Sequence, residues 1–207
     1  FTLMDKKKRT LISCAMLADE VNHILQQTDI DLPVIWVERG LHSTPEKLNR
    51  ILQHYIDALQ NQDEILLTFG LCGNGLISKH TLLRLPRFDD CINQLLCKKP
   101  RTERKQTETD AIYLTRGWTL DKEAILQQYQ ILSRQYEPEI RDMILQTMYG
   151  GYHTLSVIDT GSFDLKPVEQ YADQAAACLN FTRNTVSGNI STLEHLIVGT
   201  NDPEKKY

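Results

Sequence analysis

The chain has 207 residues, of which 41% are hydrophobic and 24% are charged, and its formal net charge is −4. This length and composition indicate a globular protein with one sizeable core, or one core with an added lobe. The weakly acidic balance of charge disfavours nucleic acid as a partner. No apolar run approaches the ~20 residues that cross a bilayer. The N-terminus also lacks the apolar core of a signal peptide. We therefore expect a cytoplasmic protein that binds neither nucleic acid nor membrane, and whose cysteines are thiols, metal ligands or nucleophiles rather than disulfides.

Short apolar runs alternate with segments of helical periodicity along the chain. The predicted strands are 9–14, 34–38, 65–69, 82–86, 112–115, 154–158 and 182–186. The predicted helices are 15–27, 45–59, 76–80, 91–96, 122–135, 139–149, 167–179 and 193–198. This alternation predicts a Rossmann-like α/β fold, with a largely parallel sheet and helices on both of its faces. We expect a single domain over 1–207, and a division into two lobes near the polar stretch 98–111 is the alternative.

The segment 65–75 is the most informative part of the chain, because a buried strand ends there in a glycine-rich turn. The turn reads Gly-Leu-Cys-Gly-Asn-Gly and lacks the GxGxxG spacing of a dinucleotide site. Glycines permit positive φ and close approach of the backbone, so a ligand, a metal or a tight chain crossing would each explain them. The turn N–H groups and a following arginine could also hold an anion. The residues predicted for anion or substrate binding here are Gly70, Gly73, Asn74, Gly75 and Arg87.

Cysteines follow the ends of three predicted strands. Cys14 ends the first strand, Cys72 lies in the turn after the third, and Cys91 begins a helix after the fourth. Ligands bind at the carboxyl edge of such sheets, near the point where the strand order reverses, so the three sulfurs could converge there. Three thiolates could hold an iron–sulfur cluster or a zinc ion with one open position. Thiol catalysis by Cys72 or Cys91 is a third option, whereas Cys97 and Cys178 lie on helical stripes and are interpreted as structural.

Three further side chains at strand exits could carry chemistry. Glu38 and His42 flank a tight turn and could form an acid–base pair. The alternative is that Glu38 only satisfies backbone donors beside Gly40. Asp159 opens the sequence Asp-Thr-Gly after a later strand, where it could bind a ligand or could belong to a plain turn.

Several segments together resemble DUF1638, a family of uncharacterised prokaryotic proteins. The resemblance extends from about Arg9 to Gly199, and its most specific pair of elements is Gly-Leu-His at 40–42 with the turn at 70–75. The other matching residues are Cys14, Trp36, Glu38, Arg39, Pro45, Pro86, Arg87, Asp90, Cys91, Ile92, Tyr113, Leu114, Thr115, Gly117, Trp118, Ile158, Asp159, Thr160 and Gly161. The resemblance implies that Cys14, Cys72 and Cys91 fall on characteristic positions, and that some relatives accompany corrinoid-dependent methyl transfer. The chain departs from the family at Asp89, where a histidine is usual.

These observations lead to two predicted functions. The first is a small-molecule enzyme or cofactor-handling protein with a three-cysteine metal centre, either an iron–sulfur cluster or zinc. Its chemistry would be methyl, thiol or sulfur transfer on a small substrate, linked to corrinoid methyl metabolism, because an open metal position suits a sulfur substrate. The second is a non-catalytic accessory that binds metal or corrinoid, or a sensor that partners a methyltransferase protein. A structural zinc site is a third interpretation.

Overall fold

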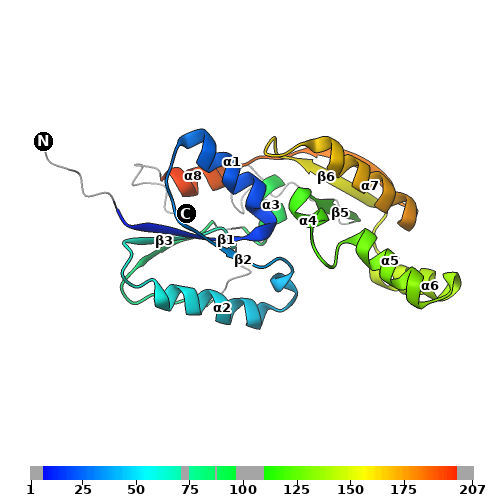
Figure 1. The fold of residues 1–207 in the computed structure, drawn as a ribbon, viewed down its shortest axis with the longest axis horizontal. Coiled ribbons are helices and arrows are strands. Elements are labelled where there is room, and N and C mark those ends of the chain that lie inside the picture. Colours follow the sequence, from blue (N-terminus) through cyan, green and yellow to red (C-terminus); the bar gives the residue numbers. More distant parts are fainter. Residues whose placement is uncertain (1–6, 71–74, 87, 97–109, 200–207) are drawn as a thin grey trace, which may run out of the picture.

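The computed structural model describes residues 7–70, 75–86, 88–96 and 110–199. Within these ranges the strands form two parallel sheets, one of four strands in the order β2-β1-β3-β4 and one of three in the order β5-β6-β7. The two sheets lie side by side along the long axis of the molecule (Figure 1). The predicted α/β fold with parallel strands is therefore confirmed, although the strands are divided between two sheets instead of forming one. The division into domains stays a prediction.

The first part of the chain builds the four-stranded sheet. Its strands are β1 (Arg9–Cys14), β2 (Val34–Val37), β3 (Glu64–Leu67) and β4 (Leu82–Arg84). Its helices are the 3-10 helices η1 (Ala15–Leu17) and η2 (Leu41–Ser43), and the α-helices α1 (Ala18–Thr28), α2 (Pro45–Ala58) and α3 (Cys91–Leu96).

The strand order reverses at β1, so the helices on either side of this strand cover opposite faces of the sheet. Ile12 and Ile65 project to one face and pack against Leu52 of α2. Their neighbours Leu11 and Leu66 project to the other face, where α1 and a later helix cover them. Because both faces are covered, the central strands read as continuous apolar runs, as the sequence indicates.

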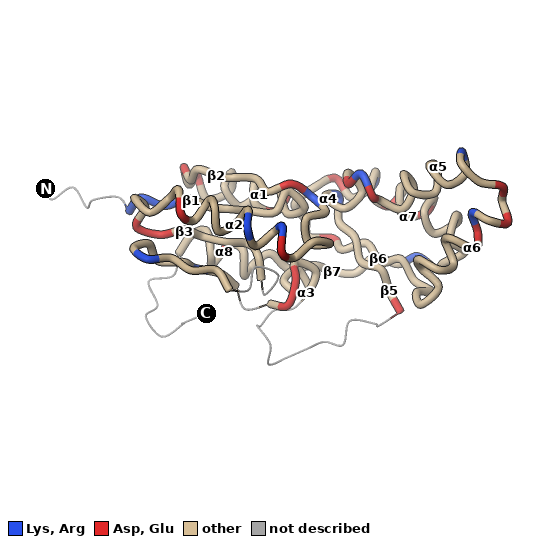
Figure 2. The backbone as a smooth tube through the Cα atoms, turned by 90° about the horizontal axis from the view of Figure 1, so that it is seen from below, with Lys and Arg blue, Asp and Glu red and all other residues tan. Residues whose placement is uncertain are grey.

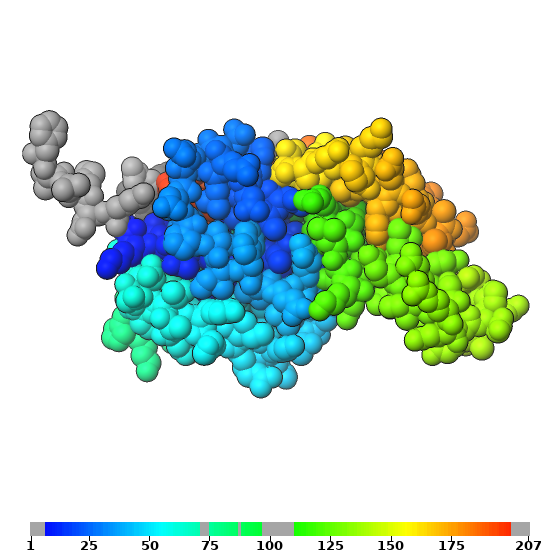
Figure 3. All heavy atoms as spheres, viewed as in Figure 1, coloured from blue at the N-terminus to red at the C-terminus, as the bar shows by residue number. Residues whose placement is uncertain are grey.

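The later part of the chain builds the three-stranded sheet. Its strands are β5 (Ala111–Leu114), β6 (Thr154–Asp159) and β7 (Thr182–Ser187). The helices are α4 (Arg116–Thr119), α5 (Ile125–Gln135), α6 (Pro138–Tyr149), α7 (Leu165–Leu179) and α8 (Ser191–Val198). Helices α5 and α7 cover one face of this sheet through a separate hydrophobic cluster. Helices α5 and α6 form a hairpin (Figure 1), which protrudes at one end of the molecule (Figure 3).

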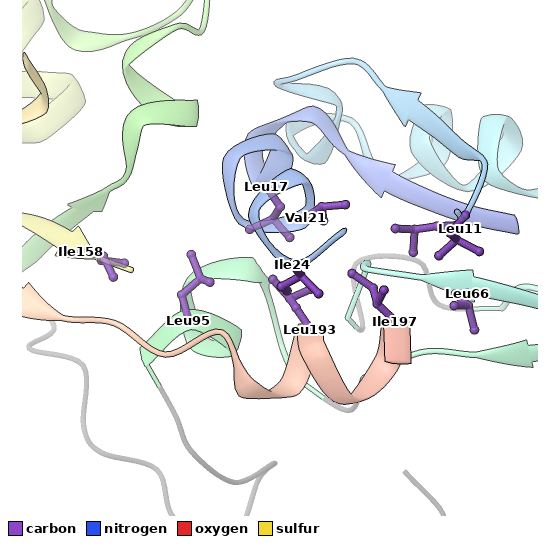
Figure 4. Packing of buried hydrophobic residues seen from close by; sticks show 10 residues of the cluster. Leu11, Leu17, Val21, Ile24, Leu66, Leu95, Ile158, Leu193 and Ile197 are labelled. Carbon is purple, nitrogen blue, oxygen red and sulfur yellow. The ribbon is translucent and has the colours of Figure 1, made fainter. Parts of the chain in front are cut away.

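One hydrophobic cluster joins the two sheets. It contains Leu11 of β1 and Ile158 of β6, with Leu95 of α3 and Val21 of α1 between them (Figure 4). The last helix, α8, returns to the first sheet and packs beside α1, where Leu193 is fully buried. The two sheets are therefore parts of one packed molecule. Figure 2 shows acidic and basic residues interspersed along its length.

The predicted helix at 76–80 is wrong, because this segment is not helical. Gln53 of α2 replaces the helical hydrogen bonds: its amide Nε2 donates to the carbonyl of Ile77 and its Oε1 accepts from the Ile77 N–H, at 2.8 and 3.0 Å. Gln60 similarly accepts from the N–H of His80 at 3.0 Å. The polar stretch expected at 98–110 lies almost wholly outside the described residues. No helix in the described ranges is both long and apolar enough to cross a membrane.

Candidate functional site

A cavity of about 1220 Å³ lies at the carboxyl edge of the first sheet. Cys14, at the end of β1, and Gly70, beyond the end of β3, both line it. These two strands are neighbours at the point where the strand order reverses, which is where α/β sheets bind their ligands. The position of the cavity is therefore the one that strand topology predicts for a functional site.

Cys14 is held at the cavity wall by hydrogen bonds between β1 and β3. Its backbone N–H donates to Thr68 Oγ1 at 3.2 Å, and the same hydroxyl lies 3.1 Å from Ser13 Oγ. Ser13 and Thr68 are both buried, and Thr68 also lines the cavity. This bonding fixes the backbone that carries the sulfur.

Cys91 lines the same cavity from a different element, the first turn of α3. The helix begins here because Asp90 caps it: Oδ1 accepts the backbone N–H of Asn93 at 2.7 Å and Oδ2 accepts the amide Nδ2 at 3.1 Å. Capping by this acidic residue was predicted and is confirmed. The structure thus brings two of the three predicted cysteine ligands to one cavity.

The third predicted ligand, Cys72, lies outside the described residues, as do Gly73, Asn74 and Arg87. The residues that flank the turn, Gly70 and Gly75, both line the cavity. Within 7–70, 75–86, 88–96 and 110–199, no group of three His, Cys, Asp or Glu side chains is placed to hold a metal ion. A metal centre here therefore needs a ligand from beyond the described part of the chain.

The two described glycines of the turn have different structural causes. A Cβ on Gly70 would lie 2.1 Å from the carbonyl oxygen of Phe88, so this glycine permits a tight crossing of two chain segments. Gly75 has φ of +82°, in the left-handed region that favours glycine. Backbone packing accounts for Gly70 without an anion.

The described charges on the cavity wall do not favour an anion. Three carboxylates, those of Glu38, Glu46 and Asp90, line the cavity together with Arg50. The predicted role in anion binding therefore depends on residues that the structure does not describe.

Glu38 and His42 both line the cavity but are not hydrogen-bonded to each other. Glu38 Oε1 accepts from Lys122 Nζ at 2.9 Å, and this bond lowers the pKa of the exposed Glu38 carboxyl. The His42 ring packs instead against Trp118, with centroids 5.3 Å apart and planes inclined by 57°. The bond from Lys122 makes the Glu38 carboxylate a weaker base, so His42 is the better candidate of the two for proton transfer.

Trp118 is a wall residue that the predicted site lacks. It belongs to α4, which follows β5 of the second sheet. A Cβ on Gly117 would lie 2.0 Å from the carbonyl oxygen of Met16, so glycine allows α4 to press against η1 and present Trp118. The sequence signal was the Gly-Trp pair after a predicted strand, but only the packing of the two sheets places it at this cavity.

Two other residues lie apart from the cavity. Asp159 ends β6, and its Oδ1 accepts the backbone N–H of Gly161 at 3.0 Å, which is a turn arrangement. Asp159 is not among the lining residues, so the structure does not unite it with the other candidates. Cys178 lies on α7 with a pKa raised by burial, as a structural thiol would.

Comparison with known proteins identifies a family. Residues 36–197 match the family described as "Protein of unknown function (DUF1638)", and no curated protein or solved structure matches the chain. The matched region contains Cys72 and Cys91, whereas Cys14 precedes it. Because the match covers well over half of the 207 residues, the chain belongs to the DUF1638 family.

Proposed function

We propose that this protein handles a small molecule in the cavity at the carboxyl edge of the first sheet, using a cysteine-bound metal centre. The observation that carries the proposal is that Cys14 and Cys91, from β1 and α3, line a single cavity. Cys72 would supply the third thiolate, and its neighbours Gly70 and Gly75 line the same space. Thiolate ligands favour an iron–sulfur cluster or zinc.

The chemistry of such a centre is activation of a sulfur- or methyl-bearing substrate at an open coordination position. The residues of this chain would orient that substrate and move protons. His42 is the candidate proton-transfer group because it lines the cavity beside the Trp118 ring. Apolar side chains such as Phe69 and Ile92 on the wall would limit the access of water.

The test is metal and acid-labile sulfide analysis of protein purified without oxygen. We expect stoichiometric iron with sulfide, or zinc, and a loss of at least half of it in Cys14→Ser, Cys72→Ser and Cys91→Ser. Cys178→Ser is the matched control and should retain the full content, because Cys178 lies on α7 away from the cavity. Protein without metal, or equal losses in all four variants, would rule out the proposed centre.

A non-catalytic accessory or corrinoid-binding role is the second candidate. The cavity, at about 1220 Å³, is larger than the ~300–1,000 Å³ of ordinary small-molecule sites, which favours a bulky ligand. This role predicts stoichiometric binding of a corrinoid without turnover, measurable by spectral titration. The enzyme role predicts a product instead.

A further inference from the structure

The two halves of the molecule meet along a contact beside the cavity, which we call the seam. On the first side are η1 and α1; on the second are α4 and the turn after β6. The Arg116 guanidinium of α4 pairs with Asp19 of α1, and Gly117 packs against the Met16 carbonyl. Met16 also lines the cavity, so the seam and the cavity share a wall.

A buried carboxyl lies in the seam. The Glu20 side chain of α1 is 0% exposed, and its Oε1 accepts from Thr160 Oγ1 at 3.0 Å. Its Oε2 is buried and has no hydrogen-bond partner among the residues that the structure describes. Buried carboxylates are usually paired with cations or several donors, because removing the charge from water is costly. Glu20 is an exception, because its donors are only its own backbone N–H and the Thr160 hydroxyl from the second half.

In the described part of the chain no Lys or Arg forms an ion pair with Glu20. Asp19 on the same helix raises the pKa of Glu20 further and is itself paired with Arg116, and His23 lies one turn farther along α1. Asp159 precedes Thr160 in the turn after β6, and its carboxylate accepts from Gly161. Helix α3, which packs against α1, carries no Asp, Glu, Lys, Arg or His. The titratable side chains of the adjoining α8 are exposed: Glu194 and His195.

Other buried polar groups on the elements around the seam are also unsatisfied. Among the described residues, both amide atoms of Gln94 on α3, the hydroxyl of Thr115 before α4 and the hydroxyl of Ser156 on β6 are buried without partners. Strand alternation places Ser156 on the same face of β6 as Ile158, which packs toward α1 and α3 (Figure 4). These groups gain hydrogen bonds when water reaches them, so opening this region costs less than opening a fully paired contact.

We infer that the Glu20–Thr160 contact is a proton-linked latch that regulates the cavity by holding the two halves together when Glu20 is protonated. An open seam would let water reach the carboxylate and would move Trp118, which the second half contributes to the cavity wall. The latch is argued from the contacts in the seam and does not depend on the proposed function. Its effect on activity does rest on the proposed function.

The direction of the pH effect follows from the burial. Burial raises the pKa of Glu20 from 4.5 to about 7 in the closed seam, whereas a hydrated carboxyl in the open seam returns to its ordinary value. Between these two values the closed form binds more protons than the open form. The closed form therefore loses stability as pH rises through this window, and above about 7 the effect is constant.

Trp118 fluorescence can report the latch, because the chain has only two tryptophans. Trp36→Phe leaves Trp118 as the single emitter, and Trp36 lies on β2 outside the cavity wall. In metal-free Trp36→Phe protein we expect a reversible change in Trp118 emission with a midpoint between pH 4.5 and about 7. Glu20→Gln in this background should abolish it.

Three variants separate the latch from other causes. Thr160→Val removes a hydrogen bond that exists only in the closed seam, so the seam should open at lower pH and the midpoint should fall. Glu194→Gln, an exposed carboxyl on α8, should leave it unchanged. His42→Asn tests the imidazole beside Trp118, and the transition should persist in this variant. A transition that is absent from the parent, survives Glu20→Gln or disappears in His42→Asn would overturn the latch.

The outcome is independent of the metal centre. The transition should also persist in a Cys14→Ser, Cys91→Ser double variant, which removes two proposed thiolate ligands. If anaerobically purified protein contains no metal but shows a normal transition, the metal centre is rejected and the latch is retained. Metal-loaded protein without a transition would retain the metal centre and reject the latch.

Discussion

At the residue scale, Gly70 illustrates how a sequence motif can have a purely steric cause. Its added Cβ would meet the Phe88 carbonyl at 2.1 Å, and backbone atoms cannot move away cheaply. We expect Gly70→Ala to lower the free energy of unfolding by about 1–3 kcal/mol, the usual cost of overpacking. Urea denaturation measures this loss in the free energy of unfolding. Gly151→Ala is the control, because no atom lies within 4 Å of its added Cβ, and an equal loss in both variants would contradict the crossing.

Thr68 is the residue that fixes Cys14. Its hydroxyl accepts from the Cys14 N–H at 3.2 Å and contacts Ser13 Oγ at 3.1 Å, all within a buried region. Thr68→Val keeps the shape but removes the hydroxyl that accepts from the Cys14 N–H, so we expect a loss of about 1–3 kcal/mol in unfolding free energy. Thr68→Ser retains the hydroxyl and should lose less than Thr68→Val. If the two variants are equally stable in chemical denaturation, the hydroxyl does not support Cys14.

At the element scale, the start of α3 depends on Asp90. Because its carboxylate accepts two hydrogen bonds from Asn93, we expect Asp90→Ala to destabilise the protein by about 1 kcal/mol. Asp90→Asn keeps an oxygen acceptor and should recover most of the loss in a thermal or urea unfolding measurement. If the alanine and asparagine variants are equally stable, the cap does not determine the stability of the protein.

The first turns of two other helices differ from what the local sequence predicts. Thr44 precedes α2 and Pro45 occupies its first turn as predicted, but the Thr44 hydroxyl accepts no helix hydrogen bond. The predicted helix 15–27 begins as the 3-10 helix η1, and Met16 in this turn lies against Gly117 of α4. Tertiary contact therefore modifies the ends of elements whose existence and type were correctly predicted.

At the scale of the whole molecule, the buried Glu20 makes stability depend on pH. Its folded-state pKa of about 7 exceeds the unfolded value of 4.5, so the native state binds more protons and loses stability as pH rises between them. The loss is at most about 3 kcal/mol, since each tenfold change in proton affinity corresponds to ~1.4 kcal/mol, and it stops at the pH where the seam opens.

Glu20→Gln should remove this dependence while leaving the other titrations unchanged. We therefore expect the variant to be more stable than the parent at pH 8, with the difference shrinking as pH falls toward 4.5. Urea unfolding at several pH values, without metal, measures the difference. A difference that is constant with pH would show that Glu20 titrates alike in the folded and unfolded chains.

Most of the secondary structure and the parallel pairing can be predicted from local patterns, because apolar periodicity and turn residues are local signals. The positions of Cys14 and Cys91 at the carboxyl edge of a sheet can also be predicted, since strand exits in parallel sheets share one edge. Three other features cannot be predicted in this way. The division into two sheets, the position of Trp118 on the cavity wall and the burial of Glu20 all depend on contacts between segments far apart in the chain, which no local pattern records.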